Sequence, residues 1–299
     1  MKINNKKRRK SKFQSTIINP TRFSTSQIKY YLILIPIALI MILPILYIFV
    51  TAFKPIDELT KWPPSFFVYK PTLSNFSDLF NLSDQTRIPV SRYLFNSITV
   101  SLITVILTIF ISTLAGFALS KLKFKLNGVI MKINTIALMF VSASIAIPKY
   151  LIVEKLGLTN TFFVNIIPSL AMPVGLFLIK QFIDLIPDEL IESARMDGAS
   201  NFEVYFKVII PLIMPAIATV AILSFQSAWN DTSASINYID EDALKTFAYY
   251  LSTLVTAENT VAGAGMLAAS TLIMFLPNLL VFIFLQSRVM DTMAHSGIK

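Results

Sequence analysis

The sequence predicts an all-α polytopic membrane protein with six transmembrane helices, and three observations support this fold class. Hydrophobic residues make up 55% of the 299 positions and charged residues only 14%, with a mean hydropathy of +0.66. A soluble domain carries about 25% charged residues, so this composition indicates an integral membrane protein. Apolar runs long enough to cross a bilayer recur along the chain. No cysteine is present, which excludes a disulfide framework and thiol chemistry.

Each apolar run has the length of about 20 residues that an α-helix needs to span the hydrocarbon core. The first run follows a basic tail, residues 1–29, and precedes Lys54 and Pro55. Its length predicts an uncleaved anchor rather than a cleaved signal peptide. Prolines within several runs predict kinked helices. The predicted spans are residues 30–53, 96–119, 128–148, 162–182, 208–229 and 266–286.

The basic residues predict the orientation of the chain. Residues 1–29 hold nine Lys and Arg residues and no acidic residue. Beside a span, such a block favours the cytoplasmic side, and Lys121, Lys123 and Lys125 after the second run do the same. Both termini are therefore expected in the cytoplasm. The richness in Lys, Asn and Ile without Cys suits a low-GC bacterium, whose cytoplasmic (inner) membrane would hold the chain. The predicted membrane domain covers residues 30–299, with extracytoplasmic loops at about 54–92 and 230–263.

A polar segment separates the fourth run from the fifth. Pro187 suits a first helical position, and the acids that follow it favour the positive end of a helix dipole. Gly198 can supply the left-handed residue that ends a helix. Ser200 and Glu203 have the spacing of a capping box, which begins a second helix. The sequence predicts two cytoplasmic helices at about 187–207 joined by a glycine turn, a feature suited to docking a partner protein.

Catalytic chemistry finds little support in the sequence. The one histidine, His295, lies in the C-terminal tail without an acid at a spacing suited to a triad or a metal site. No Gly-x-x-x-x-Gly-Lys-Ser/Thr string occurs, so no P-loop for ATP is expected in this chain. The middles of the predicted spans lack acids, which disfavours an ion-coupled secondary transporter, although that class and a channel remain alternatives.

The polar segment and its surroundings resemble the permeases of ABC importers. Glu192-Ser193-Ala194, three residues, Gly198, nine residues and Val208-Ile209-Ile210-Pro211 is similar to the EAA loop of that family, with Ser193, Val208 and Ile210 as conservative departures. Other strings resemble the carbohydrate branch and its MalG-like subunits. These strings are Lys155-Leu156-Gly157-Leu158-Thr159-Asn160-Thr161, Arg195-Met196-Asp197-Gly198-Ala199-Ser200, Pro211-Leu212 with Pro215-Ala216, Trp229-Asn230-Asp231 and Ser296-Gly297-Ile298-Lys299.

The resemblance implies a type I ABC importer for sugars or oligosaccharides, in which this non-catalytic subunit forms half of the translocation pathway. Its partners would be a second, MalF-like permease, two ATPase subunits and an extracytoplasmic solute-binding protein. The chain would bind no cofactor, because ATP and magnesium would belong to the ATPase. The hairpin would couple the ATPase to the membrane helices. Its first helix is amphipathic, and Leu190, Ile191 and Ala194 can offer apolar contacts beside a charged rim of Glu189, Glu192 and Arg195. The expected coupling residues are Glu189, Glu192, Ser193, Ala194, Arg195, Asp197, Gly198, Ala199 and Pro211.

Two further sets of residues are candidates for substrate transfer. Polar and aromatic residues near the spans suit hydroxyl bonding and stacking on sugar rings. The resemblance also directs the loop at 230–263 towards the binding protein. Membrane lipid is a further expected partner, and nucleic acid is not. The alternative to a carbohydrate permease is an ABC permease for another solute, such as an amino acid or phosphonate. The pathway candidates are Asn134, Ser142, Trp229, Asn230, Asp231 and Asn278, and the loop candidates are Tyr238, Asp240, Tyr249 and Tyr250.

Overall fold

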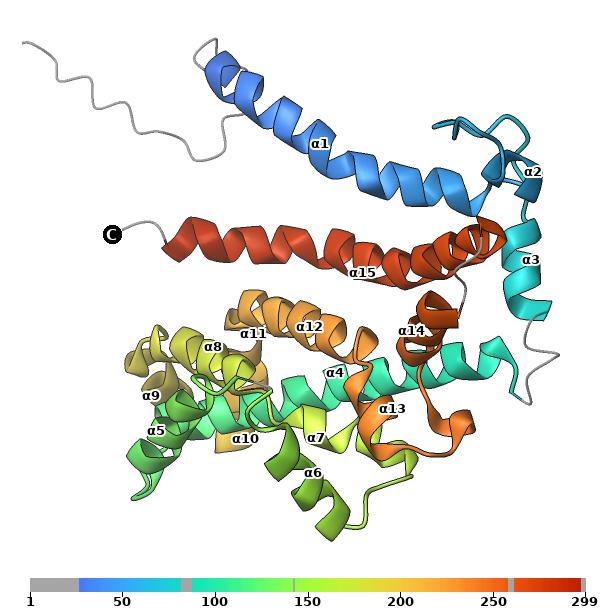
Figure 1. Cartoon of the computed structure of the whole chain (residues 1–299). Coiled ribbons are helices and arrows are strands. Elements are labelled where there is room, and N and C mark those ends of the chain that lie inside the picture. The colour runs from blue at the N-terminus through green and yellow to red at the C-terminus, as the bar shows by residue number, and fades with distance from the viewer. Residues whose placement is uncertain (1–26, 82–87, 142, 258–260, 297–299) are drawn as a thin grey trace, which may run out of the picture. The chain divides into compact units, whose positions relative to one another are not determined.

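The computed structural model describes residues 27–81, 88–141, 143–257 and 261–296, and every regular element in these ranges is a helix (Figure 1). The chain divides into two compact units, residues 1–43 and 44–299. Within the described residues, the first unit consists almost entirely of the first part of α1 (Ile28–Ala52), and the second contains the remaining helices. Most of the predicted basic tail, residues 1–26, lies outside the described residues.

Three helices of the described chain are long and apolar enough to cross a membrane. They are α1, α4 (Val90–Lys121) and α15 (Val261–Ser296), and they correspond to the first, second and sixth predicted spans. α4 begins at Val90 rather than at residue 96, and α15 extends beyond the predicted run at both ends. The positions of these three apolar runs are thus predicted correctly, whereas two of the helices extend beyond them.

The fourth and fifth predicted spans are bent helix pairs. Residues 162–170, comprising η3 (Phe162–Asn165) and α7 (Ile167–Leu170), meet α8 (Pro173–Asp184) at 42°. Pro173 explains this break, because proline lacks the N–H of a continuing helix and its ring clashes with the carbonyl four residues earlier.

The bend in the fifth predicted span is sharper. Residues 201–212 meet α12 (Met214–Trp229) at 78°, with the join at Ile213 and Pro215 just inside α12. The first arm contains α10 (Asn201–Glu203), the π-helical η4 (Val204–Ile209) and α11 (Ile210–Leu212). Only α12 therefore continues as the span predicted at 208–229, while the first arm belongs to the polar hairpin.

The third predicted span, residues 128–148, is not one helix, and this part of the six-span prediction needs correction. Two helices of 11 and 10 residues take its place, α5 (Asn127–Ala137) and α6 (Ala146–Lys155). Pro148 lies in the first turn of α6, where a missing N–H costs least, and its ring disfavours a helical conformation that continues through Ser144. By length and composition, the described helices supply three spans, or five if each bent pair counts as one.

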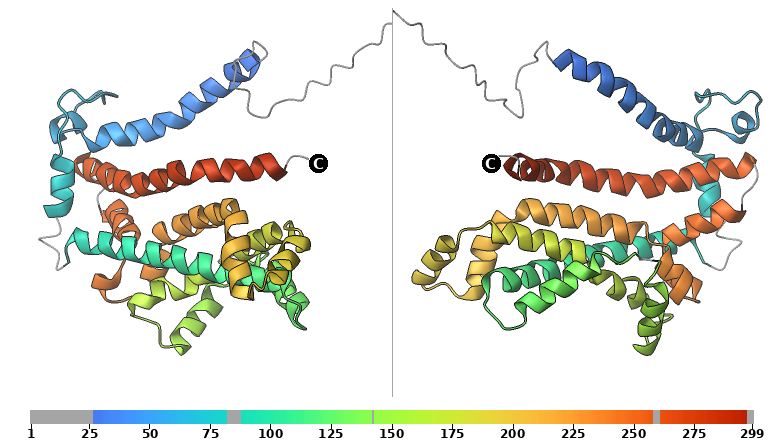
Figure 2. Two further views of the ribbon diagram at one scale, coloured as in Figure 1. Left: turned by 180° about the vertical axis from the view of Figure 1, so that it is seen from behind. Right: turned by 60° about the vertical axis from the view of Figure 1, so that its left-hand side comes forward.

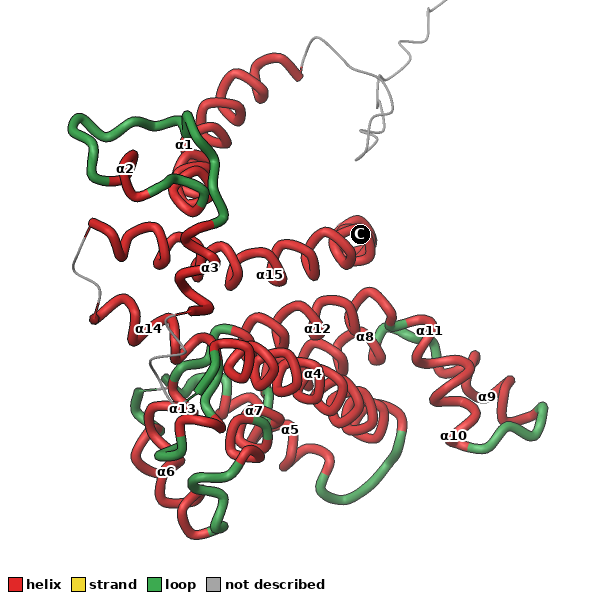
Figure 3. Tube along the Cα trace, turned by 90° about the vertical axis from the view of Figure 1, so that its right-hand side faces the viewer, coloured by secondary structure: helices red, strands yellow, loops and turns green. Residues whose placement is uncertain are grey.

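The core of the second unit lies where α4, α8 and α12 pack together, and α12 also packs against α15 (Figure 2). Figure 3 shows α4 and α12 running side by side, with the hairpin helices α9 (Asp188–Met196) and α10 beyond their ends. The largest cluster of buried apolar residues joins these helices to the hairpin. It contains Phe117, Ile179, Ile183, Ile186, Ile191, Val204, Tyr205, Ile209, Ile213, Ala216 and Val220.

The two predicted extracytoplasmic loops contain more helix than the sequence predicts. The segment 54–92 holds two short helices, α2 (Ile56–Leu59) and α3 (Ser74–Asn81). The segment 230–263 holds α13 (Ser233–Tyr238), η5 (Asp242–Leu244) and α14 (Phe247–Ala257). α14 packs against α4 and α15, so tertiary burial accounts for a helix within this predicted loop.

Candidate functional site

The polar hairpin begins with α9, which starts one residue later than predicted. Pro187 has an extended conformation and occupies the N-cap position, so Asp188 and Glu189 form the first turn. The buried Nζ of Lys121 donates to Oδ1 of Asp188 and to the carbonyl of Ile186, both at 2.7 Å. The hydrogen bond from Lys121 and, to a smaller extent, the positive charge of Lys121 lower the pKa of Asp188. The end of α4 is thereby tied to the start of the hairpin.

The turn of the hairpin has the predicted chemistry. Gly198 has a φ of +85°, the left-handed conformation that favours glycine. The amide of Gly198 donates to the carbonyl of Arg195, and that of Ala199 to the carbonyl of Ala194, each at 3.0 Å. This pattern is a Schellman motif, which ends a helix and reverses the chain.

The second helix of the hairpin starts with the predicted capping box. The amide of Ser200 donates to Oε2 of Glu203 at 3.0 Å, and the amide of Glu203 donates back to Oγ of Ser200 at 3.3 Å. The backbone hydrogen bond from Ser200 and the side-chain hydrogen bond from Lys207 lower the pKa of Glu203 to about 2. Glu203 is therefore ionised at neutral pH and can hold the cap.

Buried residues fix the hairpin to the membrane helices. Ile191, Val204 and Tyr205 are at most 3% exposed and belong to the core cluster. The Tyr205 hydroxyl lies 2.7 Å from Oγ1 of Thr113 on α4, and its ring lies 5.7 Å from that of Phe117. The hairpin is thus a packed part of the helix bundle rather than a loose loop.

The outer surface of the hairpin differs from the one that helical spacing suggests. Of the residues expected to offer apolar contacts, Ile191 is buried in the core and Ala194 packs against it, which leaves Leu190 at 48% exposed. Three exposed apolar side chains were not predicted from the sequence. Two of them are Phe residues at positions i and i+4 of the second helix, a spacing that could have indicated a shared surface. The three residues are Met196, Phe202 and Phe206, at 88%, 71% and 55% exposed.

Most of the predicted coupling residues lie on this exposed side. Arg195 donates to Oδ1 of Asn201 at 3.1 Å, which links the two helices across the turn. Ala194 and Ala199 are half-buried and touch the core cluster. The remaining predicted residues are exposed, namely Glu189, Glu192, Ser193, Arg195, Asp197, Gly198 and Pro211.

The predicted pathway residues fall in two places. Asn134 on α5 is buried and donates to the carbonyl of Pro173 at 3.1 Å, beside the break between α7 and α8. Asn278 on α15 approaches Asn230 at the end of α12, with a distance of 3.4 Å from Nδ2 to Oδ1. Asp231 accepts from the amide of Ser233 at 2.9 Å. Ser142 lies outside the described residues.

Trp229 adjoins the Asn230–Asn278 pair but is buried between helices. Its Nε1 donates to the carbonyl of Met274 at 3.0 Å, and its ring stacks on Phe225 with an interplanar angle of 12°. At 2% exposed, the indole presents no open ring face in this conformation. Its role in the pathway stays a prediction, while its role in joining α12 to α15 is evident from these contacts.

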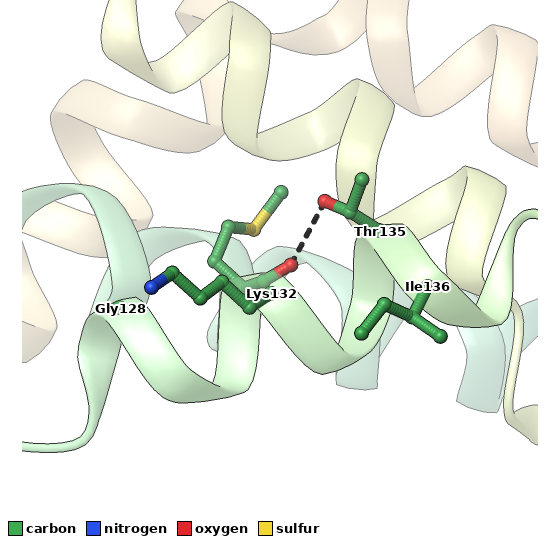
Figure 4. Close-up of a pocket in the computed structure, with 5 residues that line it drawn as sticks. Gly128, Lys132, Thr135 and Ile136 are labelled. Carbon is green, nitrogen blue, oxygen red and sulfur yellow. Dashed lines mark hydrogen bonds between the residues drawn. The ribbon is translucent and has the colours of Figure 1, made fainter.

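Two concavities lie near α5. A cavity of about 200 Å³ is bordered by Ser112, Asn134, Met172 and Pro173 among others, at the break between α7 and α8. A shallow groove runs along α5 itself, where Oγ1 of Thr135 donates to the carbonyl of Met131 at 2.9 Å (Figure 4). Neither lining contains an acidic residue or histidine, and the described residues hold no group of three or more potential metal ligands of the His, Cys, Asp and Glu types.

The four predicted loop residues differ in accessibility. Tyr238 is buried and stacks on Tyr150 at 5.8 Å, and Tyr250 is buried and stacks on Tyr93 at 5.1 Å. Asp240 is exposed and Tyr249 is half-buried beneath Lys245. The tyrosines at 238 and 250 therefore hold the loop in place, and Asp240 is the member most open to a partner.

Asparagines that the sequence reasoning missed anchor this loop. Asn160 has a φ of 54°, and its Oδ1 accepts from the amides of Asp240 and Glu241 at 3.2 and 2.9 Å. Asn96 on α4 donates to the carbonyls of Ala243 and Lys245, both at 2.8 Å. Asn160 occurs in a string already noted for its resemblance, whereas nothing in the sequence singles out Asn96.

Comparison with known proteins decides the family. Residues 109–287 match the family described as "Binding-protein-dependent transport system inner membrane component", which is more than half of the chain. The chain belongs to this family. The permease is 30% identical over 258 residues to the sulfoquinovosyl glycerol transport system permease protein SmoH of Agrobacterium fabrum, covering 86% of this chain and 88% of that protein.

Other relatives agree with this assignment. The permease is 27% identical over 266 residues to the arabinooligosaccharides transport system permease protein AraQ of Halalkalibacterium halodurans, covering 88% of this chain and 93% of that protein. Its fold is similar to a chain in the crystal structure of a bacterial ABC transporter involved in the import of the acidic polysaccharide alginate. That match has a TM-score of 0.75 and 22% identity, and covers 90% of this chain and 99% of the other.

Family membership confirms several predictions from the sequence. The chain is an all-α, multi-pass membrane subunit of the ABC importer permease type. Members of this family are non-catalytic and act with a second permease, an ATPase and a binding protein, so the permease is not an enzyme.

Proposed function

We propose that the permease carries a sugar or oligosaccharide across the bacterial cytoplasmic membrane and forms half of the pathway, with a second, MalF-like permease as the other half. The relatives named above are permeases for sulfoquinovosyl glycerol and arabinooligosaccharides, which supports a carbohydrate substrate. The Asn134 and Asn230–Asn278 sites supply hydroxyl-bonding amides. Uptake of labelled oligosaccharides, compared with uptake of amino acids and phosphonates, tests the substrate class.

The polar hairpin is the proposed coupling element, and its attachment to the bundle is the observation that carries this proposal. Its exposed side offers apolar and charged groups to an ATPase, while Tyr205, Val204 and Ile191 tie its other side to the core. Closure of two ATPase subunits on ATP and magnesium would therefore move the ends of α4 and α12 together with the hairpin. ATP and magnesium belong to the ATPase in this scheme, and the permease binds no cofactor.

Substitution of Gly198 tests this coupling role. Gly198→Val forces a β-branched residue into a left-handed conformation. The substitution is expected to disrupt the turn without displacing the membrane helices. We expect the variant to insert normally, to lose uptake and to copurify less ATPase. Gly157→Val is the matched control, because Gly157 also has a positive φ (+67°) and open surroundings but lies outside the hairpin. Normal uptake and ATPase copurification by Gly198→Val would overturn the coupling role.

The proposed orientation places the hairpin and both termini in the cytoplasm and the segments 54–92 and 230–263 outside. Asp240 and Tyr249 then face the solute-binding protein that delivers the substrate. Because the chain has no cysteine, Asp240→Cys and Glu192→Cys can be labelled in intact cells with a membrane-impermeant maleimide. Labelling of Asp240→Cys alone is expected, and labelling of Glu192→Cys alone would reverse the orientation.

A further inference from the structure

The segment between α2 and α3 carries exposed aromatic side chains beside the end of α1. Trp62, Phe67 and Tyr69 are 87%, 72% and 77% exposed. Lys61 and Lys70 flank them and are also exposed. Large apolar groups gathered on one short segment mark a surface that meets something other than bulk water.

Hydrogen bonds fold this segment back on itself. The Nζ of Lys54, a residue only 3% exposed, donates to the carbonyl of Ser65. The carboxylate of Glu58 accepts from the amides of Tyr69 and Lys70 at 3.1 and 2.8 Å. Figure 3 shows the resulting loop curled beside α2 and the end of α1. The aromatic residues are thus held in place rather than carried on a free chain.

One ring contact fixes the depth of the loop relative to the span. The ring of Phe66 lies 6.3 Å from that of Tyr47. Tyr47 precedes the end of α1 at Ala52 by five residues, which corresponds to about 7.5 Å along the helix axis. A helix of 25 residues is roughly 37 Å long, against about 30 Å for the hydrocarbon core, so an upright α1 centred in the bilayer would extend its last residues into the headgroup layer. Phe66 therefore reaches the boundary between headgroups and acyl chains.

We propose that residues 61–70 form an interfacial anchor that binds the lipid headgroup layer next to the C-terminal end of α1. Trp and Tyr rings favour this layer because one part of each ring system is apolar and another is polar. The flanking Lys61 and Lys70 can reach lipid phosphates while their stems lie along apolar groups. Phe66 and Phe67 supply the purely apolar contact. The anchor holds the end of α1 at a set depth and depends on neither the substrate nor the coupling role of the hairpin.

Spin labelling tests the anchor directly. The chain has no cysteine, so Trp62→Cys and Tyr69→Cys each give one nitroxide site in this subunit, with the signal of the equally treated wild-type transporter subtracted. Asp78→Cys, exposed on α3 in the same external segment, is the aqueous control. Ile40→Cys, in the middle of α1 and 67% exposed, is the hydrocarbon control. The full-length protein, with the subunits that copurify, is reconstituted in phosphatidylcholine and phosphatidylglycerol vesicles.

Collision rates with oxygen and with a water-soluble nickel chelate then report depth. Labels at positions 62 and 69 are expected to meet the nickel chelate several-fold less often than the label at position 78. They should meet oxygen more often than that label but less often than the label at position 40. Rates equal to those of Asp78→Cys would overturn the anchor. Low collision rates with both reagents would also overturn it, because they would assign the surface to a protein partner.

Discussion

The hydroxyl of Tyr205 in the hairpin and Oγ1 of Thr113 in α4 are 2.7 Å apart, and both residues are almost completely buried. Oγ1 of Thr113 donates its own proton to the carbonyl of Ile109 at 2.7 Å, so the tyrosine is the donor of the pair. A directed bond between two packed elements ties α4 to the hairpin. This contact is a candidate link between partner docking and the membrane helices.

Tyr205→Phe is expected to weaken this link while preserving the fold. Removal of one buried hydrogen bond costs about 1 kcal/mol, and the ring contacts of Tyr205 with Phe117 remain. We expect a lower Tm and less uptake per ATP hydrolysed. Thr113→Val should have a similar effect, and the double variant should cost less than the sum of the two. Tyr30→Phe, at an exposed site, is the control; additive effects of the two buried substitutions would contradict the link.

Gly116 lies where α4 packs so closely against α8 that no side chain fits between them. A Cβ added there would lie 2.7 Å from Cγ2 of Ile179 and 3.4 Å from the backbone nitrogen of Lys180. Alanine improves helix propensity by about 1 kcal/mol, but overpacking costs about 1–3 kcal/mol. We expect Gly116→Ala to lower the Tm of the purified transporter. Gly128→Ala meets no atom within 4 Å and should leave it unchanged or raise it; the reverse order would contradict the observed packing.

The features predicted correctly from the sequence are local. The conformation of Gly198 and the capping box of Ser200 and Glu203 depend on residues at most five positions apart, so spacing alone determines them. Prolines within the runs predict kinks, but the sequence alone does not show how their effects differ. Pro148 lies in the first turn of α6 in the broken third span, whereas Pro277 lies within one continuous helix.

The features that sequence reasoning missed depend on contacts between distant segments. Tyr205 and Thr113 are 92 positions apart, and Asn96 reaches carbonyls almost 150 positions away. Helical spacing places Leu190 and Ile191 on one apolar side. In the structure, Ile191 packs into the buried core cluster, whereas Leu190 is exposed. The same holds for Trp229, whose residue type suits sugar stacking while its surroundings provide a packing role.

The capping box should respond to acid. The pKa of Glu203 falls from 4.5 to about 2 in the folded hairpin, so its contribution to stability is complete above pH 4.5. That contribution is lost as the pH falls from about 4.5 to about 2, because protonation removes the charge that Ser200 and Lys207 stabilise. Amide exchange in a peptide covering the capping box, corrected for intrinsic rates, should accelerate over this window. Glu203→Gln should show no such change, and identical profiles for the two proteins would contradict the charge dependence.

Trp229→Phe separates packing from substrate contact. The substitution removes the hydrogen bond from Nε1 to the Met274 carbonyl, worth about 1 kcal/mol, and leaves unfilled volume between α12 and α15. The carbonyl keeps a donor, because Nδ2 of Asn278 also bonds to it at 3.1 Å. We therefore expect a lower Tm with an unchanged KM for uptake.

Asn230→Ala provides the matched comparison at the neighbouring position. Asn230 is exposed and its Oδ1 accepts from Asn278, so its loss opens a polar site without emptying the core. If this pair lines the pathway, Asn230→Ala should raise the KM for sugar uptake and change the Tm little. A raised KM for Trp229→Phe with an unchanged Tm would instead mean that the indole leaves its packed position and meets the substrate during transport.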